Sequence, residues 1–179
     1  ANMAVKNVNA ALEEYRFNEA ANLIYEFWWN EFCDWYLELV KQRIYSKDPA
    51  AGESSDAAKQ VLYYVLKNGL RLLHPFMPFI TEEIWSIIKI DGETDIMVSQ
   101  WPEYSDSMVF GDESHYAETF KEIIYKIRNV RGEMNIPPDK KAAVVFKTVS
   151  PLITNIINTE SVHIQALAKV ESVEINANY

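Results

Sequence analysis

The chain has 179 residues, of which 49% are hydrophobic and 13% aromatic. This composition excludes a disordered protein, and the length fits one ordinary domain or one domain with a small appendage. Apolar runs such as 75–80 are too short to cross a bilayer, so we expect no membrane partner. The single cysteine, Cys33, cannot form an internal disulfide, and we expect it to be a small buried hydrophobic residue of a cytoplasmic protein.

The formal net charge of −9 argues against a dedicated nucleic-acid binder, but the charge is unevenly distributed. Residues 1–120 are acidic overall. Residues 121–147 reverse the sign, with 7 Lys or Arg against 3 Asp or Glu, and residues 148–179 return to 1 against 3. An acidic protein can still bind RNA where its positive groups cluster. The block 121–147 is therefore the candidate region for phosphate contacts.

The first 50 residues predict two helices. A short helix is expected over 5–14, and a long helix begins at Phe17, because apolar residues then recur every three or four positions. The residues expected to face inward from the long helix are Phe17, Ala21, Ile24, Trp28, Phe32, Trp35 and Leu39.

Two further helices follow a predicted loop over 46–55. Ser54 or Ser55 can cap the third helix, and His74-Pro75 ends it because proline disfavours the helical conformation of the preceding residue. Pro78 suits the first turn of the fourth helix. This helix is expected to end near Ile88 and to turn four residues inward, namely Ile80, Ile84, Ile87 and Ile88. Amphipathic helices joined by short loops predict an antiparallel bundle.

The second half of the chain changes character. Residues 96–101 predict an extended segment, and 114–134 predict a helix that Pro137-Pro138 stops. A short helix with Ser150 as its N-cap follows. The β-branched runs predict strands over 142–149, 162–164 and 170–175. The predicted fold class is mainly α, with an antiparallel helical bundle over 1–103, an acidic linker over 104–113, and a helix plus a small α/β subdomain over 114–179.

The sequence contains no recognisable catalytic constellation. Its three histidines are far apart, and Glu160-Ser-Val-His163 is a single copy of a spacing that di-iron bundles use twice. No Gly-rich phosphate loop, nucleophile elbow or paired cysteines are present. We therefore expect no catalytic residue, no metal and no cofactor in this chain.

The aromatic residues between 27 and 36 allow two interpretations. Trp29 lies off the main apolar stripe of the long helix. It can cover the edge between two helices, or it can stack on an unstacked RNA base.

The basic residues likewise allow two interpretations. Arg128 and Arg131 are three residues apart on one helical face, and Lys140 and Lys141 follow the Pro-Pro break. These four residues can bind RNA phosphates or base edges, or the two arginines can form ion pairs on the helix surface. Two further RNA-binding candidates, Lys41 and Arg43, end the long helix, where cations are favourable in any case.

Four blocks of sequence resemble the anticodon-binding region of valine–tRNA ligases, and the resemblance covers about residues 5–179. The blocks are Asn-Glu-Phe-Cys-Asp-Trp-Tyr at 30–36, His-Pro-Phe-Met-Pro-Phe at 74–79, Ser-Gln-Trp-Pro at 99–102 and Arg-Asn-Val-Arg-Gly-Glu-Met-Asn-Ile-Pro-Pro at 128–138. The leucine, isoleucine and methionine enzymes share the bundle, and the first and last blocks select valine.

The resemblance implies a docking role for tRNA(Val). It implies a parent class I synthetase that uses ATP to attach valine, with the catalytic domain of the parent chain as partner. The parent's His-x-Gly-His and Lys-Met-Ser-Lys-Ser signatures do not occur in this sequence, so we expect an excised region without the catalytic and editing sites. The alternatives are the same role in an isoleucine or leucine enzyme, or a non-catalytic helical scaffold that binds protein.

Overall fold

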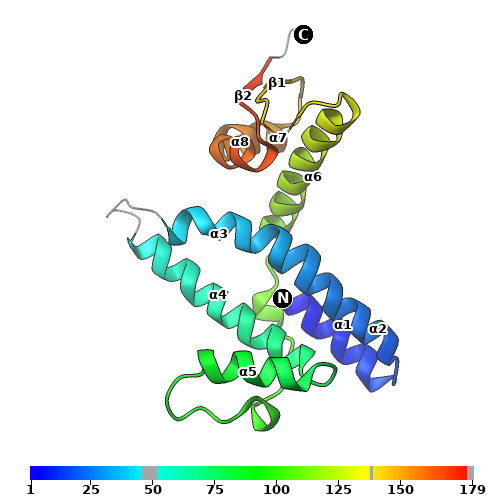
Figure 1. The fold of residues 1–179 in the computed structure, drawn as a ribbon. Coiled ribbons are helices and arrows are strands. Elements are labelled where there is room, and N and C mark those ends of the chain that lie inside the picture. Colours follow the sequence, from blue (N-terminus) through cyan, green and yellow to red (C-terminus); the bar gives the residue numbers. More distant parts are fainter. Residues whose placement is uncertain (46–51, 138, 177–179) are drawn as a thin grey trace. The chain divides into compact units, whose positions relative to one another are not determined.

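The structure is a computed structural model that describes residues 1–45, 52–137 and 139–176 (Figure 1). The chain divides into two compact units, Ala1–Val109 and Phe110–Tyr179, which we call unit 1 and unit 2. The division falls inside the segment 104–113. The mainly α fold class is confirmed, since helices account for most of both units and the strands form one small sheet.

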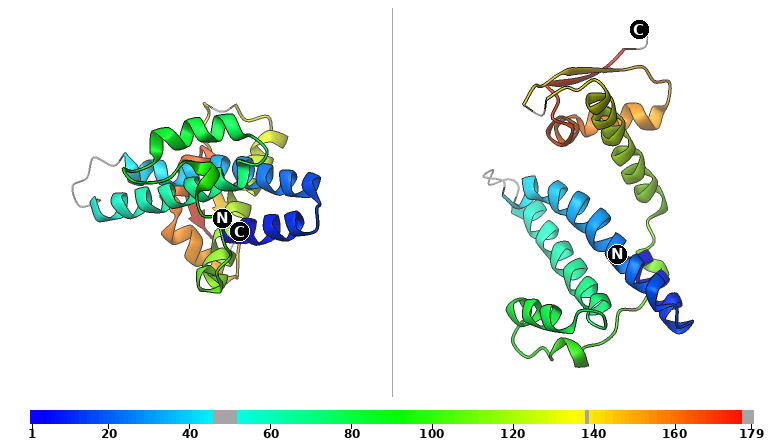
Figure 2. Two further views of the ribbon diagram at one scale, coloured as in Figure 1. Left: turned by 90° about the horizontal axis from the view of Figure 1, so that it is seen from below. Right: turned by 45° about the vertical axis from the view of Figure 1, so that its right-hand side comes forward.

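Unit 1 consists of helices and short helical turns. Its regular elements are α1 (Asn2–Glu13), α2 (Phe17–Glu26), the π-helical stretch η1 (Phe27–Tyr36), α3 (Leu37–Ile44), α4 (Gly52–Leu73), α5 (Pro78–Ile88) and the 3₁₀ turns η3 (Ile96–Val98) and η4 (Asp106–Met108). α2, η1 and α3 form one continuous helix, and α4 runs antiparallel beside it (Figures 1 and 2). The predicted extended segment at 96–101 is wrong at its start, where η3 forms instead.

The wide π-helical turn follows from the position of one acidic residue. An α-helical period would place Glu31 on the apolar face, four residues after Phe27 and four before Trp35. The π-helix instead buries Phe27, Phe32 and Trp35 and leaves Glu31 exposed. The wider turn is visible in the N–H of Leu37, which bonds the carbonyl of Phe32, five residues earlier.

Two expectations about this long helix are therefore wrong. Phe17 is exposed, although the stripe predicted it inward, and Cys33 is also exposed. From Ile24 onward the buried positions alternate in steps of three and five rather than three and four, because the π-helix has more residues per turn than an α-helix. They are Ile24, Phe27, Phe32, Trp35 and Val40.

The prolines place the ends of α4 and α5. α4 ends at Leu73, just before His74-Pro75, and Pro78 occupies the first turn of α5. The predicted cap at Ser54 or Ser55 is wrong, since α4 already includes both residues. Of the predicted loop 46–55, residues 46–51 lie outside the described residues.

The inward face of α5 also differs from the expectation. Ile80 and Ile87 are exposed, whereas Thr81 and Trp85 are buried. Thr81 donates to the carbonyl of Met77, and the indole N–H of Trp85 donates to the carbonyl of Thr94 at 3.0 Å. The helix thus turns Trp85 inward and leaves Phe79 exposed, and this orientation also satisfies the polar atoms of Thr81 and Trp85.

Unit 1 contains two clusters of buried apolar side chains. One joins α1 and α2 to the end of α4, and the other joins α4, α5 and η3. Their buried members are Val5, Val8, Ala11, Ala20, Ile24 and Leu72 in the first, and Leu70, Trp85 and Ile96 in the second.

Unit 2 contains a helix followed by a small α/β arrangement. Its elements are α6 (Gly111–Glu133), β1 (Ala143–Phe146), α7 (Pro151–Thr159), α8 (Ser161–Ala168) and β2 (Ser172–Ile175). β1 and β2 pair in parallel, with Ala143 opposite Ser172 and Phe146 opposite Ile175. The helices lie to one side of this sheet (Figure 2).

One strand expectation in unit 2 is wrong and one capping expectation is confirmed. Residues 162–164 lie in α8, because the parallel pairing of β1 with β2 needs a helical crossover rather than a third strand. Ser150 caps α7 by accepting from the N–H of Ile153. No described helix combines the length and apolar composition that a bilayer crossing requires.

Candidate nucleic-acid interface

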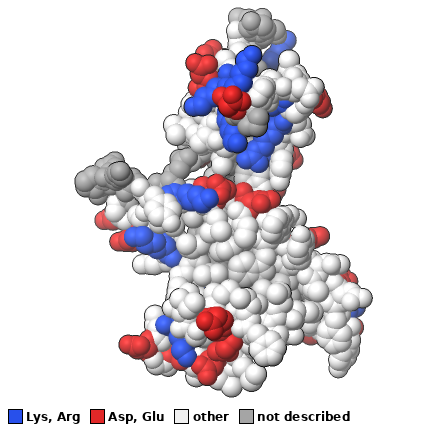
Figure 3. Space-filling model, viewed as in Figure 1, with Lys and Arg blue, Asp and Glu red and all other residues white. Residues whose placement is uncertain are grey.

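The basic block 121–147 extends from the middle of α6 to the end of β1. Figure 3 shows Lys and Arg side chains gathered on the face of unit 2 that is in view. Acidic residues at the start of α6, including Asp112 and Glu113, lie outside the block. The structure therefore places the predicted phosphate-binding region on one unit.

Arg128 bonds the end of a neighbouring helix. Its Nε and Nη2 donate to the carbonyl of Leu167, at 3.2 and 2.9 Å. This carbonyl belongs to the last turn of α8, where helical carbonyls have no partner within the helix. Arg128 is exposed, so its side chain both joins α6 to α8 and borders solvent.

Arg131 is buried, with only 8% of its surface exposed. Its Nη2 donates to the carbonyls of Pro137 at 3.0 Å and Lys140 at 2.9 Å. Asn135 adopts the left-handed conformation, with φ 51°, and so turns the chain back toward α6. Arg131 thus holds the returning segment, a role that the sequence interpretations did not include.

Lys140 and Lys141 are exposed in the segment before β1. Because the carbonyl of Lys140 accepts from Arg131, the backbone at this position is fixed while the ammonium group faces solvent. This arrangement suits phosphate contacts, since a fixed backbone reduces the entropy lost on binding.

The second basic pair, Lys41 and Arg43, is engaged within unit 1. Lys41 forms an ion pair with Glu38 one turn earlier. Arg43 donates from Nε to the hydroxyl of Ser54 at 3.0 Å and from Nη2 to the Ser54 carbonyl at 2.9 Å. The Arg43 contacts join the end of α3 to the start of α4. Both basic side chains therefore have partners within unit 1.

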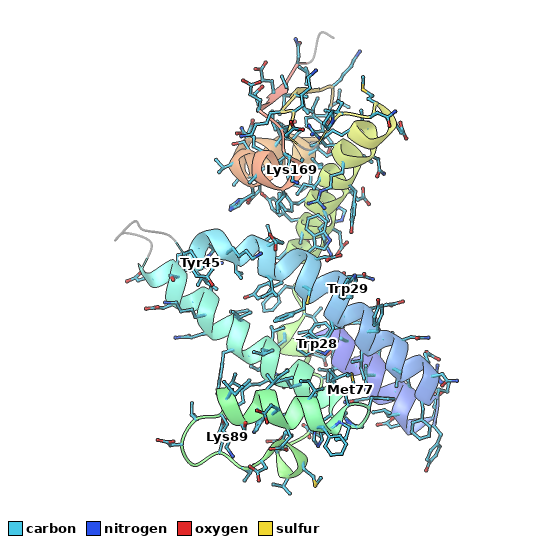
Figure 4. All side chains as sticks on the ribbon, viewed as in Figure 1. Trp28, Trp29, Tyr45, Met77, Lys89 and Lys169 are labelled. Atoms are coloured by element: carbon cyan, nitrogen blue, oxygen red, sulfur yellow. The ribbon has the colours of Figure 1, made fainter. Side chains whose placement is uncertain are left out.

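Trp29 is an exposed aromatic side chain, with 57% of its surface accessible. Its ring stacks on that of Tyr25, one turn earlier, with the centroids 6.3 Å apart and the planes within 4°. Figure 4 shows Trp29 on the outer side of the long helix. The pair Tyr25–Trp29 offers a flat aromatic face of the kind on which RNA bases stack.

The neighbouring Trp28 has a different environment. Its ring packs against Gly69 of α4, where a Cβ atom would lie 2.8 Å from Cζ2 of Trp28. Trp28 also lines an apolar cavity of about 300 Å³ together with residues of α2, Leu73 at the end of α4, and Phe76 and Met77 between α4 and α5. Its indole N–H is buried and has no hydrogen-bond partner among the described residues.

A cationic cluster in unit 1 was not predicted from the sequence. Lys67 is 5% exposed, pairs with Glu93, and lies 4.4 Å from the ring centroid of Trp85. Arg71 lies over the same ring at 4.9 Å, and burial lowers the pKa of its guanidinium. The hydrogen bond from Lys67 lowers the pKa of the Glu93 carboxyl, and the N–H of Ile90 lowers it further. No sequence signal links these residues, because Glu93 lies in a loop after α5.

His163 and Glu160 do not gather further metal ligands. The Nδ1 of His163 lies 2.8 Å from Oε2 of Glu160. Across the described part of the chain, no group of three or more His, Cys, Asp or Glu side chains is arranged to hold a metal ion.

The sequence is similar to that of one known protein family. The sequence model of the family described as the anticodon-binding domain of tRNA ligase matches residues 1–146. The chain belongs to this family. The family resemblance stated from the four sequence blocks is thereby confirmed.

Three of the most similar curated relatives are named valine–tRNA ligase. The chain is 44% identical over 170 residues to a valine–tRNA ligase of Carboxydothermus hydrogenoformans, which covers 95% of this chain and 19% of the relative. Identity to the valine–tRNA ligase of Aquifex aeolicus is 40%, over 97% of this chain and 16% of the relative. Identity to the valine–tRNA ligase of Geobacter sulfurreducens is 41%, over 97% and 19%. The chain therefore spans less than a fifth of the length of these relatives.

Proposed function

We propose that this chain is the tRNA-docking region of a valine–tRNA ligase and that its RNA partner is tRNA(Val). The observation that carries the proposal is the match of residues 1–146 to the anticodon-binding family, together with relatives that are named for valine and cover 95% or more of the chain. These relatives favour valine over the isoleucine and leucine alternatives.

In this proposal the chain contributes binding and orientation rather than bond chemistry. The parent protein, through its own catalytic domain, uses ATP to activate valine and transfers it to the tRNA in the cytoplasm. Docking the tRNA far from the reacting groups still assists catalysis, because orientation of the reactants removes a large part of the barrier. We assign no cofactor, metal or membrane partner to this chain.

Two surfaces support the docking role with different chemistry. Lys140 and Lys141 present exposed ammonium groups for phosphates, which set the register of a bound RNA. Trp29, stacked on Tyr25, presents an aromatic face for an unstacked base. Phosphate contacts and base stacking together are the two components of recognition of single-stranded RNA loops.

The test is direct binding of this chain to tRNA(Val), tRNA(Ile) and an unrelated tRNA at two salt concentrations. We expect the tightest binding to tRNA(Val), weakening steeply with salt because phosphate contacts release counterions. Preference for tRNA(Ile) would contradict the assignment to valine. Binding to none of the three tRNAs, by a chain that circular dichroism shows to be folded, would contradict the docking role and favour a scaffold.

A further inference from the structure

We propose that unit 2 contains a phosphate-binding pocket between the ends of α6 and α8, and that it binds a backbone phosphate of the RNA. This inference rests on the proposed function and adds a defined site to it. The site consists of Arg128 and Arg131 from α6 and of Lys169, which directly follows α8 and lies 38 residues after Arg131 in the sequence.

The lining of the pocket is cationic. A cavity of about 340 Å³ is bordered by these three basic side chains and by small or apolar residues, with no acidic side chain among the lining residues that the structure describes. The other lining residues are Gly132, Ile136, Leu167 and Ala168. A pocket with three cationic residues and no carboxylate favours an anion.

Arg131 provides the strongest reason for an anionic ligand. Only 8% of this residue is exposed, and Nη2 donates to two backbone carbonyls, those of Pro137 and Lys140. Its Nη1 has no hydrogen-bond partner, and no carboxylate forms an ion pair with Arg131, among the described residues. A buried guanidinium with an unused donor and no counter-ion is unfavourable, and a phosphate oxygen would supply both partner and charge.

Lys169, labelled in Figure 4, adds a third positive charge to the lining of the pocket, directly after α8, which contacts α6. Its backbone is left-handed, with φ 54° and ψ 49°, directly after the last residue of α8. Glycine or asparagine is the usual residue at such a position, because the left-handed conformation costs energy for other residues. A lysine at this position is therefore unfavourable for the backbone. The ammonium group is exposed and able to reach a ligand at the mouth of the pocket.

Arg128 offsets the negative charge that the end of α8 would otherwise contribute to the pocket. The C-terminal end of α8 carries partial negative charge, which by itself would repel an anion. Two hydrogen bonds from the Arg128 guanidinium to the Leu167 carbonyl offset that charge at the pocket wall. The pocket is thus positive although it lies at the C-terminal end of a helix.

An RNA phosphate fits this surface better than free phosphate does. Arg131 also fixes the segment that carries the exposed Lys140 and Lys141. These lysines extend the positive surface beyond the pocket, which suits a chain of phosphates rather than a single ion.

The test uses Lys169→Gly, with Lys59→Ala as the matched control. Glycine accepts the left-handed conformation without strain, so this variant folds at least as well as the unsubstituted chain. Lys59 is exposed on α4, lies outside both the pocket and the basic block 121–147, and its replacement changes the net charge equally. The measurements are the affinity for tRNA(Val) as a function of salt, and the change in Tm caused by inorganic phosphate.

We expect Lys169→Gly to weaken tRNA binding several-fold and to reduce the slope of log K against log salt by about one, while Lys59→Ala leaves the slope near that of the unsubstituted chain. Equal slopes for the two variants would overturn the pocket, because a diffuse effect of charge would explain both. A phosphate-dependent rise in Tm that Lys169→Gly removes, without any change in tRNA affinity, would overturn the RNA assignment and leave a free-phosphate site. If the unsubstituted chain binds no tRNA, the proposed function fails. The effect of inorganic phosphate on Tm then decides by itself whether the pocket binds an anion.

Discussion

Gly69 lies so close to Trp28 that a Cβ atom on this glycine would fall 2.8 Å from Cζ2 of the indole and 3.2 Å from Cε2. The same Cβ would lie 3.1 Å from Cε1 of Phe27. The aromatic residues of the π-helical stretch can therefore pack on α4 only where α4 has no side chain. A glycine in the middle of a helix, unfavourable by about 1 kcal/mol, is retained here because it allows this contact.

The first prediction follows directly. Gly69→Ala should lower the free energy of unfolding of unit 1 by about 1 kcal/mol, since overpacking costs about 1–3 kcal/mol and alanine recovers about 1 kcal/mol of helix propensity. Urea denaturation followed by tryptophan fluorescence measures this change, because all five tryptophans lie in unit 1.

Gly132→Ala is the control for this prediction. A Cβ atom at Gly132, in α6, meets no atom within 4 Å. This variant should stabilise unit 2 by up to about 1 kcal/mol, detectable by circular dichroism or amide exchange. Equal effects of the two alanines would contradict the close contact at Trp28.

The second prediction separates the two arginines of α6. Arg131→Ala should destabilise unit 2 by about 2–4 kcal/mol, because it leaves the carbonyls of Pro137 and Lys140 without their charged donor and opens a cavity. Arg128→Ala should cost about 1 kcal/mol or less, since its side chain is exposed and water can replace it at Leu167. Amide hydrogen exchange in α6 and β1 distinguishes the two. Similar losses for both variants would show that Arg131 does not hold the returning segment.

The third prediction concerns acid. The pKa of the Glu93 carboxyl is lowered in the folded chain by the hydrogen bond from Lys67, and next by the N–H of Ile90. A lowered folded pKa contributes stability that is fully present above the unfolded value of about 4.3 and is lost as the pH falls through the folded value. Glu93→Gln should therefore be less stable than the parent at neutral pH, and the difference should shrink below about pH 4. Tryptophan fluorescence during denaturation at several pH values measures it, and a difference that stays constant in acid would refute the assignment.

The fourth prediction concerns base stacking. If an RNA base stacks on Trp29, Trp29→Ala should weaken tRNA(Val) binding by about 1–3 kcal/mol with little loss of stability, because this side chain is exposed. Phe79→Ala is the control, since Phe79 is an exposed aromatic residue on α5. Equal affinities of the parent and Trp29→Ala would leave Trp29 as a surface side chain that only packs on Tyr25.

The helix ends at proline residues, and the family, could be predicted from the sequence, whereas the start of α4 could not. Pro75, Pro78 and the pair Ser150-Pro151 act on their immediate neighbours, so their effects do not depend on the rest of the fold. The family could also be predicted, because four sequence blocks that resemble the anticodon-binding region occur in order along the chain.

The buried faces of the helices were decided by tertiary contacts. In α5 the prediction holds for Ile84 and Ile88, which pack against the cluster around Trp85, and is wrong for Ile80 and Ile87, which are exposed. Lys67 and Arg71 on α4 both pack on Trp85, which favours this rotation of the helix. In the long helix, the exposure of Glu31 is compatible with buried aromatic residues only in a π-helical turn. Hydrophobic period shows that an apolar stripe exists, but the partner helix selects which residues are buried.

The candidate site divides in the same way. The sequence by itself determined that positive charge gathers at 121–147 and that Trp29 lies off the apolar stripe of its helix. Only the tertiary structure decided that Arg131 turns inward and that Lys169 lies beside it at the same pocket. The carbonyls of Pro137 and Lys140 reach Arg131 only because the chain turns back at Asn135. Lys169 lies near Arg131 only because α8 packs on α6. Local composition fixes how much charge a segment carries, whereas long-range packing fixes which of those charges face a ligand.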